Sequence, residues 1–142
     1  MTRGQFALAV QALVLLARAS EGATSGTLAG SVNTRAACVR RALAPLARAG
    51  LVTATEGRAG GYRLARPAGD ITLADIYAAV AGEPLLRFET APPDPGCPIT
   101  MAVGPALARI TAEAEARFQE ALSHWTLADV DHQVDLLERW TR

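Results

Sequence analysis

Two cysteines and two histidines are the residues of this 142-residue chain whose side chains could do thiol or metal chemistry. Cys38 and Cys97 match no zinc-binding spacing, and two cysteines are too few for a disulfide framework. We therefore expect free thiols in a reducing compartment, the cytoplasm. His124 and His132 have no cysteine near them in the sequence, so we predict no metal site and interpret both as surface or core histidines.

No pattern of residues in the sequence is typical of an active site. The chain has no glycine-rich phosphate loop after a predicted strand and no nucleophile elbow. Its acidic residues fit helix caps and solvated helix faces, which need no catalytic explanation. We therefore predict that the chain is not an enzyme.

The arginines point to a negatively charged polymer as partner. The formal net charge is zero, but residues 1–69 carry nine arginines against two glutamates, whereas residues 70–142 carry five arginines against twelve acidic residues. A basic half joined to an acidic half is typical of a protein that meets a polyanion with one half and uses the other for a second role, such as self-association. Chance asymmetry is the alternative interpretation.

The first predicted element is a helix over residues 3–19. Its apolar residues recur at helical spacing, and they are Phe6, Val10, Leu13 and Ala17. A secretory leader is the alternative, but Gln11 interrupts the apolar run and Arg18 ends it. No stretch reaches the about twenty apolar residues that a membrane span needs, so we expect no membrane contact.

Two shorter helices are predicted next, and together with the first they form a helix-turn-helix. Thr24 or Ser25 can cap a helix that runs to residue 31, and Asn33 or Thr34 can cap a third helix that runs to about residue 48. Pro45 lacks an N–H group and clashes with the preceding turn, so we expect a kink or an early end there.

A basic hairpin is predicted after the third helix. Residues 51–56 and 62–66 are rich in residues that favour strands, and the loop between them, residues 57–61, holds three glycines and Arg58. A helix-turn-helix followed by such a hairpin is a winged helix. Residues 1–82 are therefore predicted to form a winged helix-turn-helix domain, which includes a helix that starts with a capping box of Thr72 and Asp75.

The C-terminal part is predicted to hold a loop and two helices. Residues 83–98 are rich in proline and form the loop, and residues 99–142 form the helices, with Gly104 and Pro105 able to delay the first. Thr126 and Asp129 repeat the capping pattern of residues 72–75 and begin the second. The long first helix has an apolar stripe that a small core cannot cover, so we expect a second copy of the chain to cover it. The predicted dimerisation residues are Val103, Leu107, Ile110, Ala114, Phe118, Leu122 and Trp125. The expected fold is mainly α with a small β-hairpin, a winged helix-turn-helix plus a long C-terminal dimerisation helix.

Several stretches of the sequence carry a family resemblance. Gly-Arg-Ala-Gly-Gly-Tyr-Arg-Leu-Ala-Arg-Pro at 57–67, Asp-Ile-Thr-Leu-Ala-Asp-Ile at 70–76 and Ala-Gly-Leu-Val at 49–52 resemble the Rrf-two family of bacterial winged-helix regulators. The likeness extends through residues 6–10 and 39–41 and, more weakly, through 97–99. It implies a dimeric repressor or activator whose third helix enters the major groove, whose wing reaches toward the minor groove and whose long helices pair.

The same resemblance bears on cofactors. Relatives that hold an iron-sulfur cluster use three closely spaced cysteines in the loop before the long helix, and here only Cys97 occupies that loop. We therefore expect no cofactor. Cys97 precedes a helix N-terminus that could lower its pKa, which makes it either a sensor thiol or a relic of a lost cluster site. Cys38 lies on the predicted reading helix, either as a small packed residue or as a second sensor.

Eight residues are expected to contact or closely approach DNA: Thr34, Arg35, Arg40, Arg41, Arg58, Gly60, Gly61 and Arg63. Thr34 and Arg35 stand at the start of the third helix, where side chains meet base edges. Gly60 and Gly61 permit the hairpin geometry and do not read sequence. For Arg40, Arg41 and Arg63, a solvated surface role is the alternative.

These patterns favour a sequence-specific DNA-binding transcription regulator. We expect a homodimer on a pseudo-palindromic operator, with repression as the outcome. The first alternative is a thiol-based redox regulator that uses Cys38, Cys97 or both. A lesser alternative is a winged-helix module that binds another protein and has no role in DNA recognition. The sequence does not identify the signal.

Overall fold

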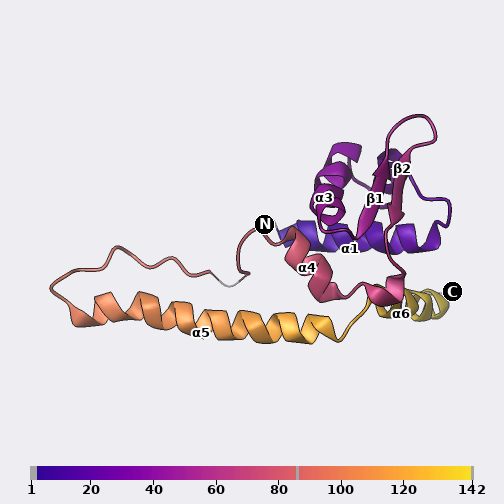
Figure 1. Cartoon of the computed structure of the whole chain (residues 1–142). Coiled ribbons are helices and arrows are strands. Elements are labelled where there is room, and N and C mark those ends of the chain that lie inside the picture. Colours follow the sequence, from indigo (N-terminus) through magenta and orange to yellow (C-terminus); the bar gives the residue numbers. More distant parts are fainter. Residues whose placement is uncertain (1–2, 86, 142) are drawn as a thin grey trace.

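The structure is a computed structural model that describes residues 3–85 and 87–141. In order, its elements are α1 (Arg3–Arg18), α2 (Ser25–Ser31), α3 (Ala36–Arg48), β1 (Val52–Thr55), β2 (Gly61–Leu64), the 3-10 turn η1 (Ala68–Asp70), α4 (Leu73–Val80), α5 (Pro98–Ser123) and α6 (Leu127–Trp140). The two strands pair in one antiparallel sheet. The predicted fold class is confirmed, a mainly helical winged helix with a long C-terminal helix (Figure 1).

The hydrophobic core lies among the first four helices. Leu13 of α1, Leu28 of α2 and Leu43 of α3 are at most 2% exposed, and Ile76 of α4 closes the cluster. Burying side chains of this size is worth about 1.5–3 kcal/mol each, which makes the cluster the main source of stability. Helix α5 contributes no apolar residue that is fully buried, but Leu127 at the start of α6 joins the core. Helices α1 to α4 therefore form a packed body to which α6 is attached.

The start of α3 differs from the sequence prediction. Thr24, one of two candidates, caps α2 by accepting a hydrogen bond from the Thr27 N–H at 3.1 Å. Neither Asn33 nor Thr34 caps α3, because Asn33 adopts the left-handed conformation, with φ of 51°, that closes the turn between the helices. Arg35 is the N-cap residue instead, and it makes no side-chain cap.

Pro45 does not end α3, so of the two predicted outcomes, a kink or an early end, the early end does not occur. The helix continues to Arg48, and the Pro45 carbonyl accepts a hydrogen bond from the Ala49 N–H at 3.0 Å. Leu43 and Leu46 on either side of the proline are fully buried. Their packing holds the helix together although the proline donates no hydrogen bond of its own.

The wing is a short hairpin with an additional backbone partner. Strand β1 pairs with β2 from Val52 opposite Leu64 to Thr55 opposite Gly61. Ala23 exchanges two hydrogen bonds with Tyr62, at 3.0 and 2.8 Å, and so forms an isolated bridge on the free edge of β2. The hairpin is thereby joined to the segment between α1 and α2.

Helix α5 is the longest element and extends away from the body (Figure 1). It starts at Pro98 and continues through Gly104 and Pro105, so the predicted delay of its start does not occur. Pro98 occupies the first helical turn, where a missing N–H costs nothing. The segment of residues 81–97 has no helix or strand in its described part and runs back along α5.

The predicted capping boxes at the starts of α4 and α6 are both confirmed, and they meet. Thr72 and Asp75 form the first box, and Thr126 and Asp129 form the second. The Leu73 N–H donates to the Trp125 carbonyl and the Leu127 N–H donates to the Ile71 carbonyl, each at 2.8 Å. The two helix starts are therefore joined directly through their backbones.

Candidate nucleic-acid interface

Helix α3 has one face in the core and one in solvent. Val39, Ala42, Leu43 and Leu46 are at most 1% exposed, whereas Arg35, Arg40 and Arg41 are all exposed. This division follows from helical spacing, because the buried residues recur three or four positions apart. The exposed arginines are thus available to a partner while the helix itself is firmly held.

Arg40 is oriented by the neighbouring helix. Its Nη1 donates a hydrogen bond to the Ser25 hydroxyl on α2 at 3.2 Å. Thr34 is half-buried, and its backbone N–H donates to the Ala29 carbonyl at 2.9 Å. Sequence reasoning missed Ser25 as a positioning residue, since no signal in the sequence links two residues on different helices.

The predicted wing residues lie where the hairpin loop requires glycine. A Cβ at Gly60 would stand 2.2 Å from the Thr55 carbonyl oxygen, and one at Gly61, where φ is +153°, would stand 2.8 Å from the Ala23 oxygen. Arg58 is exposed in the loop between these strands. Figure 1 shows α3 beside the hairpin, so the structure brings the two predicted groups of arginines to neighbouring elements.

Arg63 has a contact that the sequence did not predict. Its Nη2 lies 3.8 Å from Glu21 Oε2, and both side chains are more than half exposed. An exposed pair of this kind is worth little and can exchange for a phosphate contact. Gly22 lies beneath Arg63, because a Cβ there would stand 2.7 Å from Arg63 Cγ.

The two cysteines are free and half-buried. Cys38 lines a shallow surface depression next to Arg35 on α3. Cys97 is the N-cap residue of α5, where the neighbouring backbone N–H groups of Thr100 and Ile99 and the Thr100 hydroxyl lower the pKa of its thiol. The two thiols therefore occupy different environments, one on α3 and one at the N-terminal end of α5.

The predicted dimerisation stripe is divided between two faces of α5. Val103, Ile110 and Ala114 are exposed, and Trp125, just beyond the helix, is exposed as well. Leu107, Phe118 and Leu122 are half-buried. The Phe118 ring packs edge-on against Tyr77 of α4, with ring centroids 5.2 Å apart. The stripe thus covers part of its own chain and leaves part open.

Fold and site together define a winged-helix protein that presents exposed arginines on α3 and its wing. A family model described as "Iron-dependent Transcriptional regulator", Rrf2, matches residues 2–133. The chain belongs to the Rrf2 family, whose members are transcriptional regulators and not enzymes.

Three relatives illustrate the match. The chain is 30% identical over 130 residues to YwnA of Bacillus subtilis (strain 168), named as an HTH-type transcriptional regulator, and the match covers 92% of this chain and 96% of YwnA. A crystal structure of a transcriptional regulator from Lactobacillus plantarum has a TM-score of 0.83 at 24% identity, and 97% of each chain is covered. CymR, the global cysteine regulator of B. subtilis, has a TM-score of 0.68 at 21% identity, covering 94% of this chain and 97% of CymR. These two structures support the fold.

The family description names iron, but the donor residues of this chain do not fit an iron centre. The described residues hold no group of three or more His, Cys, Asp or Glu side chains placed to bind a metal. Cys97 is the only cysteine in the segment before α5, and Cys38 lies on α3. The absence of a cofactor remains a prediction from this donor set. In the part of the chain that the structure describes, no helix has the length and hydropathy to cross a membrane.

Proposed function

We propose that this chain is a sequence-specific DNA-binding transcription regulator that acts as a homodimer on a pseudo-palindromic operator, with repression as the outcome. The observation that carries the proposal is that Arg35, at the N-cap of α3, and Arg40 and Arg41, on α3, are all exposed, whereas Val39, Leu43 and Leu46 of the same helix are buried in the core. Such a helix can enter the major groove with its exposed face while its buried face stays packed in the core.

The division of roles follows from position. Thr34 and Arg35 stand at the N-terminal end of α3, where side chains reach base edges and an arginine can bind guanine with two hydrogen bonds. Arg58 and Arg63 in the wing are placed for the phosphate backbone or the minor groove. Only two acidic residues, Glu21 and Glu56, occur in the first 69 residues, so little negative charge opposes the approach of DNA.

The homodimer is supported by the open face of α5. Val103 and Ile110 share this face with Ile99, and the three side chains are between 42% and 72% exposed. Apolar side chains repeated along a helix in this way favour pairing with a second copy. Two copies would place their reading helices in successive major grooves, with half-sites about 10 base pairs apart.

The test is fluorescence anisotropy with DNA fragments that flank the chain's own gene, at several salt concentrations. We expect one fragment to bind far more tightly than the others, with affinity that falls steeply as salt rises. Arg35→Ala should weaken this binding about fivefold to a hundredfold, the effect of losing about 1–3 kcal/mol of base contact. Arg109→Ala, an exposed arginine on α5, is the matched control and should leave it unchanged. A folded dimer that retains no fragment at low salt would contradict the proposal.

A second candidate function is redox regulation through Cys97. The position of this thiol at the N-cap of α5, and the lowered pKa that results, favour the thiolate, which is the form that peroxide oxidises to a sulfenate with release of water or hydroxide. Peroxide should change the DNA affinity of the parent protein and of Cys38→Ser, but not that of Cys97→Ser. Equal responses of the parent and Cys97→Ser would remove this candidate.

A further inference from the structure

A groove with a volume of about 670 Å³ lies between the beginning of the segment 81–97 and one face of α5. Pro84, Arg87 and Phe88 line it from the segment, and Leu107, Ala112 and Glu115 line it from the helix. This volume lies in the range of sites that bind small organic molecules, which are mostly apolar with a few polar groups. The groove therefore has room for a ligand.

Glu115 is the unusual residue in this groove, since it is a carboxylate that is only 8% exposed. Its Oε1 accepts hydrogen bonds from the Tyr77 hydroxyl at 2.5 Å and from Gln119 Nε2 at 3.4 Å. Its Oε2 accepts one from the Leu85 N–H at 3.1 Å. All three donors are neutral, and none of the ion pairs among the described residues includes Glu115.

A buried carboxylate held only by neutral donors retains its charge at a cost. Because Oε2 has a single hydrogen-bond partner, it can accept a second one from a ligand. The other charged residues in the groove, Glu83 and Arg87, pair with each other at 2.8 Å, so their charges cancel. What remains in the groove is one unneutralised negative charge beside apolar walls.

We propose that this groove binds a small organic cation, a primary ammonium on an apolar body, with the ammonium at Glu115 Oε2 and the apolar part against Leu107 and Phe88. A charge-assisted hydrogen bond supplies the selectivity for the cation, and apolar contact supplies the remaining affinity.

The site also has a physical route to the DNA-reading body. Tyr77 belongs to α4, and its ring packs edge-on against Phe6 of α1 at a centroid distance of 5.8 Å. Burial, together with the hydrogen bond to Glu115, raises the pKa of Tyr77 to about 12, so the phenol stays a donor at neutral pH. A cation bound to Glu115 therefore alters the charge of the carboxylate that accepts the Tyr77 hydrogen bond, and Tyr77 is itself packed against α1. The regulatory half of this inference, a change in DNA affinity, rests on the proposed function.

The binding test uses the full-length protein and three probes that share an aromatic body: 2-phenylethylamine, 2-phenylethanol and 3-phenylpropionate. Isothermal titration calorimetry at neutral pH should show the amine binding at least about tenfold more tightly than the alcohol, and the carboxylate not binding. Glu115→Gln keeps a hydrogen-bonding side chain and should reduce the amine to the level of the alcohol. Glu113→Gln, an exposed glutamate on the same helix, should bind the amine as the parent protein does.

A second variant tests the site even if Glu115→Gln fails to fold. Ala112→Leu fills the groove from an exposed helix position without altering Glu115, and it should weaken amine binding at least about tenfold. Equal affinity for amine and alcohol, or no heat with any probe, would overturn the site. Amine binding without any change in DNA affinity would overturn the regulatory half alone. Amine binding by a protein that binds no DNA would leave the site in place and remove the proposed function.

Discussion

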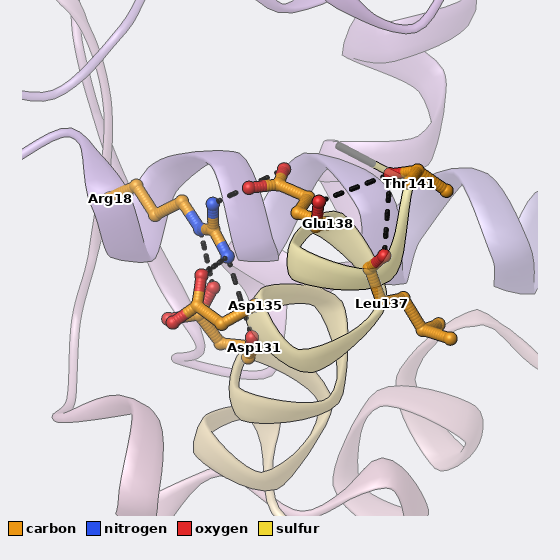
Figure 2. Close-up of polar contacts among 6 residues, drawn as sticks. All are labelled: Arg18, Asp131, Asp135, Leu137, Glu138 and Thr141. Atoms are coloured by element: carbon orange, nitrogen blue, oxygen red, sulfur yellow. Dashed lines mark hydrogen bonds and ion pairs between the residues drawn. The ribbon is translucent and has the colours of Figure 1, made fainter.

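Arg18 links the two ends of the chain through a single side chain. Its Nε donates to Asp131 Oδ1 at 2.5 Å, its Nη2 donates to Asp135 Oδ1 at 2.8 Å, and Nη1 lies 3.8 Å from Glu138 (Figure 2). The hydrogen bond to Asp131 is the main cause of a raised pKa for the guanidinium. One arginine on α1 thus faces three carboxylates on α6, and it is the only cation in this group of four.

Removing that cation should loosen α6. In Arg18→Ala three carboxylates face one another across one helix face without a counter-charge, so we expect a lower melting temperature. Thermal unfolding followed by circular dichroism measures the melting temperature. Added salt should narrow the difference in melting temperature from the parent protein, because salt screens the repulsion between the exposed carboxylates. Arg109→Ala on α5 is the control. Identical melting curves for parent and Arg18→Ala would show that the contacts of Arg18 with the three carboxylates do not help to hold α6.

Asp129 gives a pH dependence with a definite sign. Hydrogen bonds from the Thr126 N–H and hydroxyl lower its pKa in the folded state. A carboxyl with a depressed folded pKa stabilises the protein above its unfolded pKa, and that contribution is lost as pH falls through the folded value. Asp129→Asn should therefore melt lower than the parent at neutral pH, and the difference in melting temperature should close as pH falls through and below the ordinary pKa of an aspartate, about 3.9. Glu89→Gln, in the exposed segment, should show no such gap.

The wing depends on a backbone turn at Gly22, outside the hairpin, that only glycine fits well. Gly22 has φ of +81°, and a Cβ there would stand 2.7 Å from both Arg63 Cγ and the Tyr62 carbonyl oxygen. Since Ala23 and Tyr62 exchange backbone hydrogen bonds, a shift at Gly22 moves the whole hairpin. The wing is therefore positioned from outside its own loop.

Gly22→Ala should destabilise the protein by about 1–2 kcal/mol, the cost of a side chain in the left-handed region. It should also weaken DNA binding although Gly22 itself was not predicted to touch DNA. Urea unfolding and anisotropy measure the two effects. Gly26→Ala on α2, where the nearest atom to a new Cβ is 3.8 Å away, is the matched control and should not destabilise. Unchanged DNA affinity in Gly22→Ala would mean that the wing contributes nothing to binding.

For helices and strands, the sequence predicted which elements exist better than it predicted the residues at which they begin. The helix-turn-helix, the hairpin and both capping boxes follow from local patterns such as Thr72 with Asp75, which act within one turn of helix. The start of α3 does not, because Asn33 takes its conformation from the turn against α2. Pro45 is tolerated through the burial of its neighbours, a tertiary effect that local rules do not contain.

The same limit applies to the candidate site. The arginines of α3 and the wing follow from charge and spacing, and the structure places them on neighbouring elements. The Ser25 contact of Arg40 and the Glu21 contact of Arg63 join residues from different elements, so no sequence spacing encodes them. Glu115 could be recognised as a helix residue only, because its burial depends on the packing of Tyr77 and Leu85 around it.

For the whole molecule, self-association is the property that the proposed function needs most. Ile110 is 57% exposed in the middle of α5 and makes a suitable probe of it. Ile110→Glu places a charge in the proposed interface, so we expect sedimentation as a monomer and a large loss of affinity for a two-site operator. Arg117→Glu, at an exposed position of the same helix, is the control for charge alone. A variant that still sediments as a dimer would place the contact between copies elsewhere.

The joined starts of α4 and α6 also affect how the chain is made. Both starts carry the tetrapeptide Thr-Leu-Ala-Asp, at 72–75 and 126–129, and each supplies a backbone hydrogen bond that the other segment needs. Leu127 is fully buried, so the core stays incomplete until that residue has been synthesised. On the ribosome, the body formed by α1 to α4 thus stays unfinished until α6 has been made, and a premature stop before α6 yields a protein with an incomplete core and an unpaired start of α4.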